Sequence, residues 1–143
     1  MDHVAILNKQ WKIIPKLLNR QKTIESRWLK NRSAPWDRVR AGDVVYFKEA
    51  GEPVTLRAEV SGVEQYESLT SEKIKEIISL YGGEGKIFLN NPDNLDWFLP
   101  KRYCILIFIK NVSEIDPFHI DKLGYGTGAA WMCVGDINAV KKI

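Results

Sequence analysis

The sequence predicts an α+β protein built on a small β-barrel of five or six strands with two main helices. Short apolar runs of strand length recur along the chain, turn-forming residues separate them, and only two segments show the apolar spacing of a helix. Strands and helices do not alternate as they do in doubly wound parallel sheets, which favours a closed or nearly closed barrel. With 143 residues, 45% of them hydrophobic, we expect residues 1–143 to form a single domain.

The first elements are a strand over residues 4–7 and a short helix. In this helix Trp11, Ile14 and Leu18 have the spacing of one apolar face. Pro15 requires either a kink or a helix that begins near Ile14, with proline in the first turn.

Residues 23–28 alternate, which predicts a strand with Ile24, Ser26 and Trp28 on one face and Thr23, Glu25 and Arg27 on the other. A polar loop over 30–40 and a Gly-Asp turn at 41–43 then lead into a strand over 44–47. A hairpin connection at 49–53 joins it to a strand over 54–63.

A second helix is expected from Ser71 to residue 81, ended by two glycines. Its apolar stripe consists of Ile74, Ile77, Ile78 and Tyr81. Residues 90–100 are expected to be irregular, with Trp97 and Phe98 as anchors. The most apolar segment, 102–110, is the candidate central strand. A short extended piece at 117–120, a glycine-rich loop at 124–128 and a last strand over 130–134 complete the chain.

The charge distribution is uneven. Residues 9–40 contain ten basic and two acidic residues, a local charge of +8, whereas residues 59–96 contain three basic and eight acidic residues, a local charge of −5. A concentrated positive region attracts phosphate groups. The alternative is a solvated lysine-rich surface, and the acidic region could instead dock a basic protein partner.

Other features exclude several function classes. Cys104 and Cys133 lie in apolar, strand-like contexts typical of buried free thiols, although a disulfide between them stays open. His3 and His119 have no metal-spaced partners, so we expect no metal and no cofactor. No leader and no run of about 20 apolar residues is present, so we expect a cytoplasmic protein without a membrane partner. The sequence does not indicate an oligomeric state.

The segment from Lys22 to Arg27 is the most informative. Glu25 and Arg27 lie on one strand face, where a guanidinium keeps a carboxylate ionised and oriented. Arg27 could then grip a phosphate or a base edge, Glu25 could accept from an amino group, and Lys22 adds a mobile cation. An ordinary surface ion pair explains the same periodicity equally well. Strict alternation also places Lys22 on the opposite face, so convergence of all three requires a bend near Thr23.

In this segment the sequence resembles the ASCH domains of the PUA-like superfamily, which carry Gly-x-Lys-x-x-Glu-x-Arg after a first helix. The matching residues are Lys22, Glu25 and Arg27, and Thr23 is also typical. The glycine position holds Arg20, a departure that adds a cation. The family's Gly-Asp turn before a strand is matched at 42–47.

The resemblance implies a PUA-like barrel with a cleft beside the motif strand and an RNA, nucleotide or nucleoside partner. Some ASCH domains look like ribonucleases. A bacterial branch hydrolyses N4-acetylcytidine with the motif lysine, a threonine where this chain has Glu25, and a later glutamate that could correspond to Glu72 or Glu76.

We therefore expect an RNA- or nucleotide-binding module, with a small hydrolase acting on a modified nucleoside or single-stranded RNA as the alternative. In the hydrolase, Lys22 and Glu25 would be catalytic. The binding residues would be Lys22, Glu25, Arg27, Arg20, Arg38 and the base-stacking Trp36. The other tryptophans Trp11, Trp28 and Trp131 are expected in the core, and the glycine-rich loop at 124–128 is expected to be a plain turn.

Overall fold

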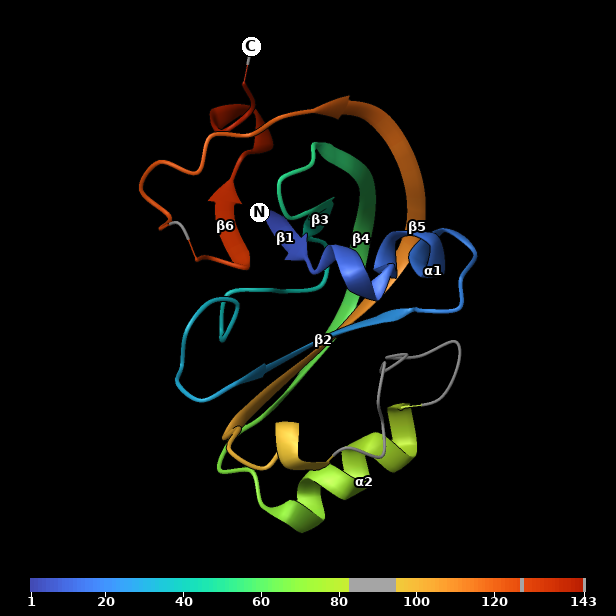
Figure 1. Cartoon of the computed structure of the whole chain (residues 1–143), viewed down its shortest axis with the longest axis vertical. Helices are drawn as coiled ribbons and strands as arrows, with labels where there is room; N and C mark the ends of the chain where they lie inside the picture. Colours follow the sequence, from blue (N-terminus) through green and yellow to red (C-terminus); the bar gives the residue numbers. More distant parts are fainter. Residues whose placement is uncertain (83–94, 127, 143) are drawn as a thin grey trace.

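The computed structural model describes residues 1–82, 95–126 and 128–142. Six strands form one mixed sheet in the order β2-β5-β4-β3-β1-β6, curled into an open half-barrel (Figure 1). The strands are β1 (Asp2–Leu7), β2 (Ile24–Leu29), β3 (Val44–Glu49), β4 (Val54–Tyr66), β5 (Tyr103–Phe118) and β6 (Trp131–Gly135). The two α-helices are α1 (Ile13–Leu18) and α2 (Ser71–Tyr81), and short 3-10 turns lie at Lys9–Trp11, Leu95–Trp97 and Ile137–Ala139. The predicted α+β barrel-like fold with two helices is confirmed.

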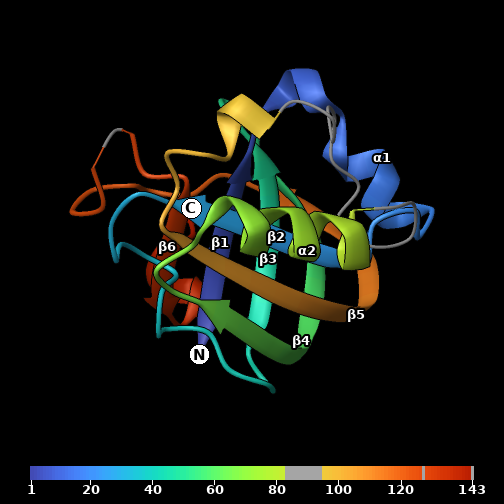
Figure 2. The same cartoon turned by 90° about the horizontal axis from the view of Figure 1, so that it is seen from below.

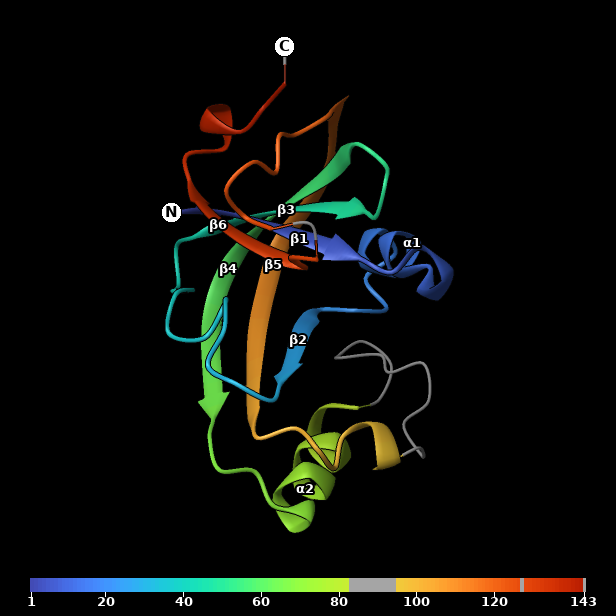
Figure 3. The same ribbon diagram turned by 60° about the vertical axis from the view of Figure 1, so that its left-hand side comes forward.

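The two longest strands, β4 and β5, set the curvature of the sheet. They pair antiparallel along most of their length with three register shifts, and such bulges increase local twist and bending (Figure 3). All neighbouring strands are antiparallel except β1 and β3, which pair in parallel. As predicted, the apolar segment that begins near residue 102 is central, because β5 pairs with both β2 and β4.

The concave side of the sheet encloses the main core, here called the interior cluster. Alternate residues of the strands point into it because successive side chains of a strand face opposite sides. Its members include Ala5, Leu7, Leu17, Phe47, Leu56, Ile105, Ile107 and Trp131. Helix α1 contributes Leu17, which is fully buried, and covers one end of this core.

Helix α2 lies on the outer side of β2 and β5 (Figure 2). Thr70 caps its first turn by accepting from Lys73 N, and Ile74 and Ile77 are buried. These side chains pack with Ile24 and Trp28 of β2. The even-numbered face of β2 is therefore occupied by α2, and its odd-numbered face is left for the barrel interior.

A third cluster lies on the outer side of β1, β3 and β6, under the C-terminal segment. Its buried members are Val4, Val54, Ile120, Met132, Ile137 and Val140. We call it the C-terminal cluster. It adds a second covered face to β1 and β3, whose odd-numbered residues Val45 and Phe47 belong to the interior cluster.

The predicted strands and helices form near their predicted positions, but β5 continues to Phe118, so the start of the extended piece predicted at 117–120 belongs to it. The face predicted for the first helix is wrong. Trp11 and Leu18 are exposed, whereas Ile13 and Leu17 are buried. The reason is Lys12, whose left-handed backbone (φ 53°) separates a 3-10 turn from α1 and shifts the helical phase. Pro15 lies in the first turn of α1, as the second alternative required.

Several sequence-based expectations concern residues outside the described ranges. They include Glu84 and Asp93 of the acidic region, residues 90–94 of the irregular segment 90–100, and Thr127 of the glycine-rich loop. Within the described part of the chain, no helix is both long and apolar enough to span a membrane.

The turn that leads into β2 is tight. Arg20 follows α1 with a left-handed backbone (φ 65°), the conformation that glycine usually supplies after a helix C-terminus. Arg20 N donates to Leu17 O, and Lys22 N donates to Lys16 O at 3.0 Å. The turn expected from the motif's glycine therefore forms with arginine, at the steric cost of a side chain in this region.

We expect Arg20→Gly to raise the free energy of unfolding by about 0.5–1 kcal/mol, because relief of left-handed strain exceeds the added entropy of the unfolded chain. Reversible urea denaturation measures the change. The neighbouring Gln21→Gly, at an ordinary φ, is the control and should be destabilising. Equal effects of the two substitutions would contradict the account of this turn.

Candidate functional site

Lys22 is placed just before β2 and is buried. Strand β2 begins only at Ile24, so the alternation of strand side chains does not extend back to Lys22. Its Nζ donates to Ile24 O at 2.8 Å, and only 4% of the residue is exposed. The bend near Thr23 that convergence required is therefore present. The expectation of a mobile cation is corrected, because Lys22 is enclosed and held at the edge of β2.

Glu25 and Arg27 point into the barrel. In the pairing of β2 with β5, Glu25 lies opposite Ile107 and Arg27 lies opposite Ile105. Both isoleucines belong to the interior cluster, so the side chains of Glu25 and Arg27 lie on that side of the sheet. Glu25 Oε2 lies 3.8 Å from Lys22 Nζ, and Glu25 Oε1 lies 3.3 Å from Arg27 Nε. One buried carboxylate thus lies between two cations.

Arg27 also connects the two edge strands of the sheet. Its Nη1 donates to Ala130 O at 3.2 Å, and its guanidinium carbon lies 5.2 Å from the centre of the Trp131 ring. Trp131 is the first residue of β6 and Ala130 directly precedes it, whereas Arg27 belongs to β2. In the described sheet these strands are the two ends of the order and share no backbone pairing. We call this place the β2–β6 junction.

Trp131 is oriented by a buried polar pair, His3 and Asp43. Its Nε1 donates to His3 Nδ1 at 3.2 Å, so His3 Nδ1 accepts and the proton of the neutral ring is on Nε2. His3 Nε2 donates to Asp43 Oδ2 at 2.8 Å. Burial is the largest effect on His3 and lowers its pKa despite Asp43, so the ring is neutral near pH 7.

The junction contains polar atoms without hydrogen-bond partners. Among the described residues, Glu25 Oε2 and Arg27 Nε are fully buried and make no hydrogen bond. Burial is also the largest effect on Lys22 and lowers its pKa; Glu25 opposes this, whereas Arg27 and Lys16 lower the pKa further. A buried polar atom left unsatisfied costs about 1–3 kcal/mol, so this arrangement is not the most stable filling of the barrel end.

The other sequence-predicted residues lie outside this group. Arg20 and Arg38 are exposed in the turns before and after β2. Trp36 is half-buried, with its ring edge-to-face against Tyr103 at 5.0 Å and the Arg32 guanidinium carbon 5.9 Å from its centre.

The remaining tryptophans and the two glutamates are also placed. Trp28 and Trp131 are core residues as expected, but Trp11 is 46% exposed. Glu72 and Glu76 are exposed on α2, which packs on the face of β2 opposite to Glu25.

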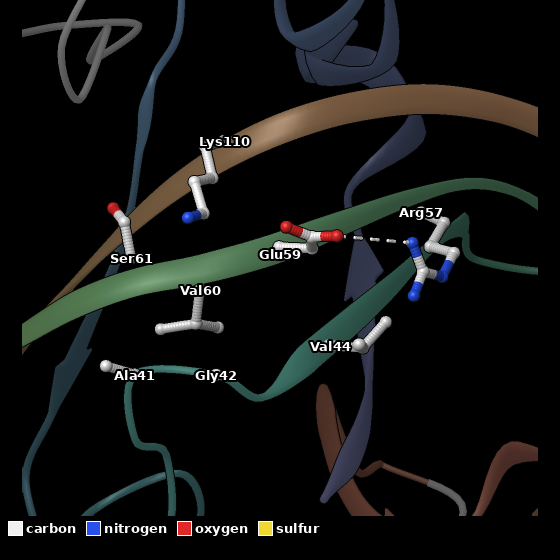
Figure 4. Close-up of a pocket in the computed structure, with 8 residues that line it drawn as sticks. All are labelled: Ala41, Gly42, Val44, Arg57, Glu59, Val60, Ser61 and Lys110. Atoms are coloured by element: carbon white, nitrogen blue, oxygen red, sulfur yellow. Dashed lines mark ion pairs between the residues drawn. The ribbon is translucent and has the colours of Figure 1, made fainter.

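A pocket of about 330 Å³ lies on the outer side of the sheet, away from the junction (Figure 4). It is lined by Ala41, Gly42, Val44, Arg57, Glu59, Val60, Ser61 and Lys110, so none of the three motif residues lines it. Glu59 is already engaged there, with Arg57 Nη1 at 3.9 Å and Asn111 Nδ2 at 2.8 Å.

Possible metal ligands and redox-active thiols were also located in the described part of the chain. It contains no group of three or more His, Cys, Asp or Glu side chains placed to hold a metal ion. Cys104 and Cys133 are both free thiols, Cys104 buried and Cys133 half-buried. Burial raises the pKa of each thiol, which lowers its reactivity.

Comparison with known proteins finds matches only among solved structures. No protein-family model matches the chain, and no curated protein matches it. The crystal structure of ASCH from Zymomonas mobilis has a TM-score of 0.66 at 16% identity, and the match covers 93% of this chain and 87% of that chain. A mutant of the same protein gives 0.66 at 16% identity over 93% and 89%. A structure of a hypothetical protein gives 0.51 at 18% identity over 80% and 100%.

The chain therefore has an ASCH-like fold, as the motif resemblance implied. Identities this low show the fold alone.

We expect the stability of the protein to rise with pH in the alkaline range because of Lys22. Its folded-state pKa is lowered by burial, while the unfolded chain binds this proton with a pKa of about 10.4. Between these two values the unfolded state holds more protons, so the free energy of unfolding increases with pH. Urea denaturation from pH 7 to 10 should give a flatter profile for Lys22→Met. Lys75→Met, on the exposed side of α2, should follow the wild type; parallel profiles for all three proteins would refute this assignment.

Proposed function

We propose that this chain is an RNA- or nucleotide-binding module that uses Lys22, Glu25 and Arg27 at the β2–β6 junction. The observation that supports the proposal most is the convergence of one carboxylate and two cations in a barrel end that is otherwise apolar. Buried charges with unsatisfied atoms are costly to fold and are enriched at functional sites.

The three side chains have complementary roles in this proposal. Arg27 presents a planar fork of donors suited to a phosphate or a base edge. Glu25 has a buried acceptor oxygen, Oε2, without a hydrogen-bond partner among the described residues, and an amino group of a base could donate to it. Lys22 places a second cation 3.8 Å from Glu25 Oε2, where β2 begins.

Access to the group would pass through Arg27. Its hydrogen bond to Ala130 O is on the exposed side of the junction, and 15% of the Arg27 side chain is exposed. An anionic phosphate is a stronger partner for a guanidinium than a neutral backbone carbonyl. Ligand binding would replace this one contact while the cation–π contact with Trp131 keeps the side chain oriented.

We also propose that Arg20, Arg38 and Trp36 contact a bound RNA strand outside the β2–β6 junction. Arg20 and Arg38 are exposed cations within the +8 segment, where they can attract the phosphates of a longer strand. Base stacking on Trp36 would use the ring face that Arg32 approaches, so it requires Arg32 to move aside or to take part in the stack.

One observation favours the second candidate, a small hydrolase acting on a modified nucleoside or single-stranded RNA. A lysine acts as a base only when its pKa is depressed, and burial has this effect on Lys22. Glu25, at 3.8 Å, would be its proton partner.

Binding of single-stranded RNA should weaken steeply with salt, and Arg27→Gln should weaken it by roughly 10–100-fold, the loss of one charge-assisted contact. Fluorescence anisotropy at several salt concentrations measures both effects. The control is Arg57→Gln, which removes the same charge from the outer pocket and should bind like the wild type. A folded wild-type protein that fails to bind at low salt, or two variants with equal affinity, would end the proposal.

The hydrolase candidate has its own test. Turnover of acetylated cytidine and of single-stranded RNA should fall at least about 100-fold in Lys22→Ala if Lys22 is the base. The Lys75→Ala variant controls for loss of a lysine elsewhere. Rates that are the same in the wild type and Lys22→Ala would remove Lys22 from any reaction.

A further inference from the structure

A second buried lysine, Lys48, lies outside the group of Lys22, Glu25 and Arg27, in a different chemical setting. Lys48 is near the end of β3 and lies between its two paired residues, Ile6 of β1 and Val54 of β4. The side chains of Ile6 and Val54 belong to the C-terminal cluster. Lys48 therefore projects to the outer side of the sheet, opposite to the interior cluster that contains the Arg27 contact. Only 8% of Lys48 is exposed, so its aliphatic stem is covered.

Loop hydrogen bonds place two further lysines near this end of β3, Lys122 through its side chain and Lys142 through its backbone. Lys122 Nζ donates to Ala129 O at 3.3 Å, and the next carbonyl, of Ala130, accepts from Ile6 N, beside Lys48.

Lys142 N donates to His119 O at 2.8 Å, directly after Phe118, which pairs with Val54 on the other side of Lys48. Figure 1 shows the β3–β4 hairpin and the C-terminal segment at the same end of the molecule.

Lys48 has more cationic than anionic neighbours. Burial is the largest effect on Lys48 and lowers its pKa; Lys122 and Lys142 lower it further, and only Glu52 opposes them. Glu52, however, is engaged by Lys9 at 2.7 Å. Within residues 1–82, 95–126 and 128–142, Lys48 Nζ makes no hydrogen bond or ion pair, and it is not among the fully buried atoms, so it keeps contact with solvent.

We propose that Lys48, Lys122 and Lys142 form a phosphate-binding site on the outer side of β1 and β3. Lys122 and Lys142 act unfavourably on the Lys48 ammonium, and an anion that binds between Lys48 and these two groups offsets that repulsion. A phosphate accepts several hydrogen bonds at once, and lysine binds it as a compact point charge without a fixed direction of approach. The phosphate could belong to a nucleic-acid backbone or to a free phosphorylated molecule.

Lys48 projects to the face of the sheet opposite to Arg27, so its substitution tests this site independently of the function proposed at the junction. Thermal unfolding of the full chain is followed with increasing inorganic phosphate at constant ionic strength, with chloride as the balancing anion. The wild-type Tm should rise with phosphate. Lys48→Met keeps the buried stem and removes the charge, and its apparent Kd for phosphate should be weaker by roughly tenfold or more. Lys75→Met and Arg57→Gln should respond like the wild type.

A second measurement separates a binding role from a structural one. Without phosphate, Lys48→Met should be at least as stable as the wild type, because it removes a repelled buried charge and keeps the packing. If Lys48→Met does not fold, the exposed Lys142→Gln variant should still weaken the response to phosphate.

The source of the phosphate is distinguished by repeating the titration with a single-stranded oligoribonucleotide that lacks terminal phosphates. A response that depends on Lys48 indicates backbone phosphate, and a response to inorganic phosphate alone indicates a free phosphorylated molecule. A wild-type Tm that is the same in phosphate and chloride would overturn the proposal. A Lys48→Met variant with the wild-type response would do so too.

Discussion

The whole arrangement depends on how the curled sheet is completed where its edge strands approach. A barrel that closes by backbone pairing has no edges, but here β2 and β6 are the two ends of the sheet and side chains make the contact between them. Arg27 is the central side chain of that contact, because it reaches Ala130 and the Trp131 ring across the junction and Glu25 on its own strand. The side chain that bridges the two edge strands is therefore Arg27, one of the charged residues of the motif.

This way of completing a barrel is not what stability alone would select. Apolar side chains would fill the same space without desolvating charges, and replacement of buried ion pairs by packed apolar groups is often stabilising. The chain instead keeps Lys22 and Glu25 almost fully covered and leaves two polar atoms without hydrogen bonds among the described residues. His3 and Asp43 reinforce the group by orienting Trp131. The molecule thus places His3, Lys22, Glu25 and Asp43 in one region, and the other buried charged residue in the described part of the chain is Lys48.

Much of this could be predicted from the sequence, because local patterns carry the information. The alternation of residues 23–28 identified the strand and the shared face of Glu25 and Arg27. The position of Lys22 could not follow from alternation, because it depends on a hydrogen bond back to Lys16 O and on where the strand begins. Trp11 was misplaced because the left-handed Lys12 interrupts the helical period.

The contacts among His3, Asp43 and Trp131 had no local signal, since the residues are 40 and 128 positions apart. Asp43 was visible as part of a turn, but its partner could be known only after β1 and β3 were seen to pair in parallel. Alignment of related sequences would show whether these positions change together. A single sequence gives no such information.

The parallel pairing of β1 with β3 has a consequence for how the chain folds. A parallel pair needs a crossover, and here the crossover contains α1 and the whole of β2, which joins the opposite end of the sheet. The Arg27–Ala130 contact then spans 103 positions, so it forms late and only after the loop-closure entropy of the intervening chain has been overcome. During synthesis, residues 1–120 contain β1 to β5 and can build most of the sheet. We expect Arg27 to remain open to water until β6 has been synthesised and docks.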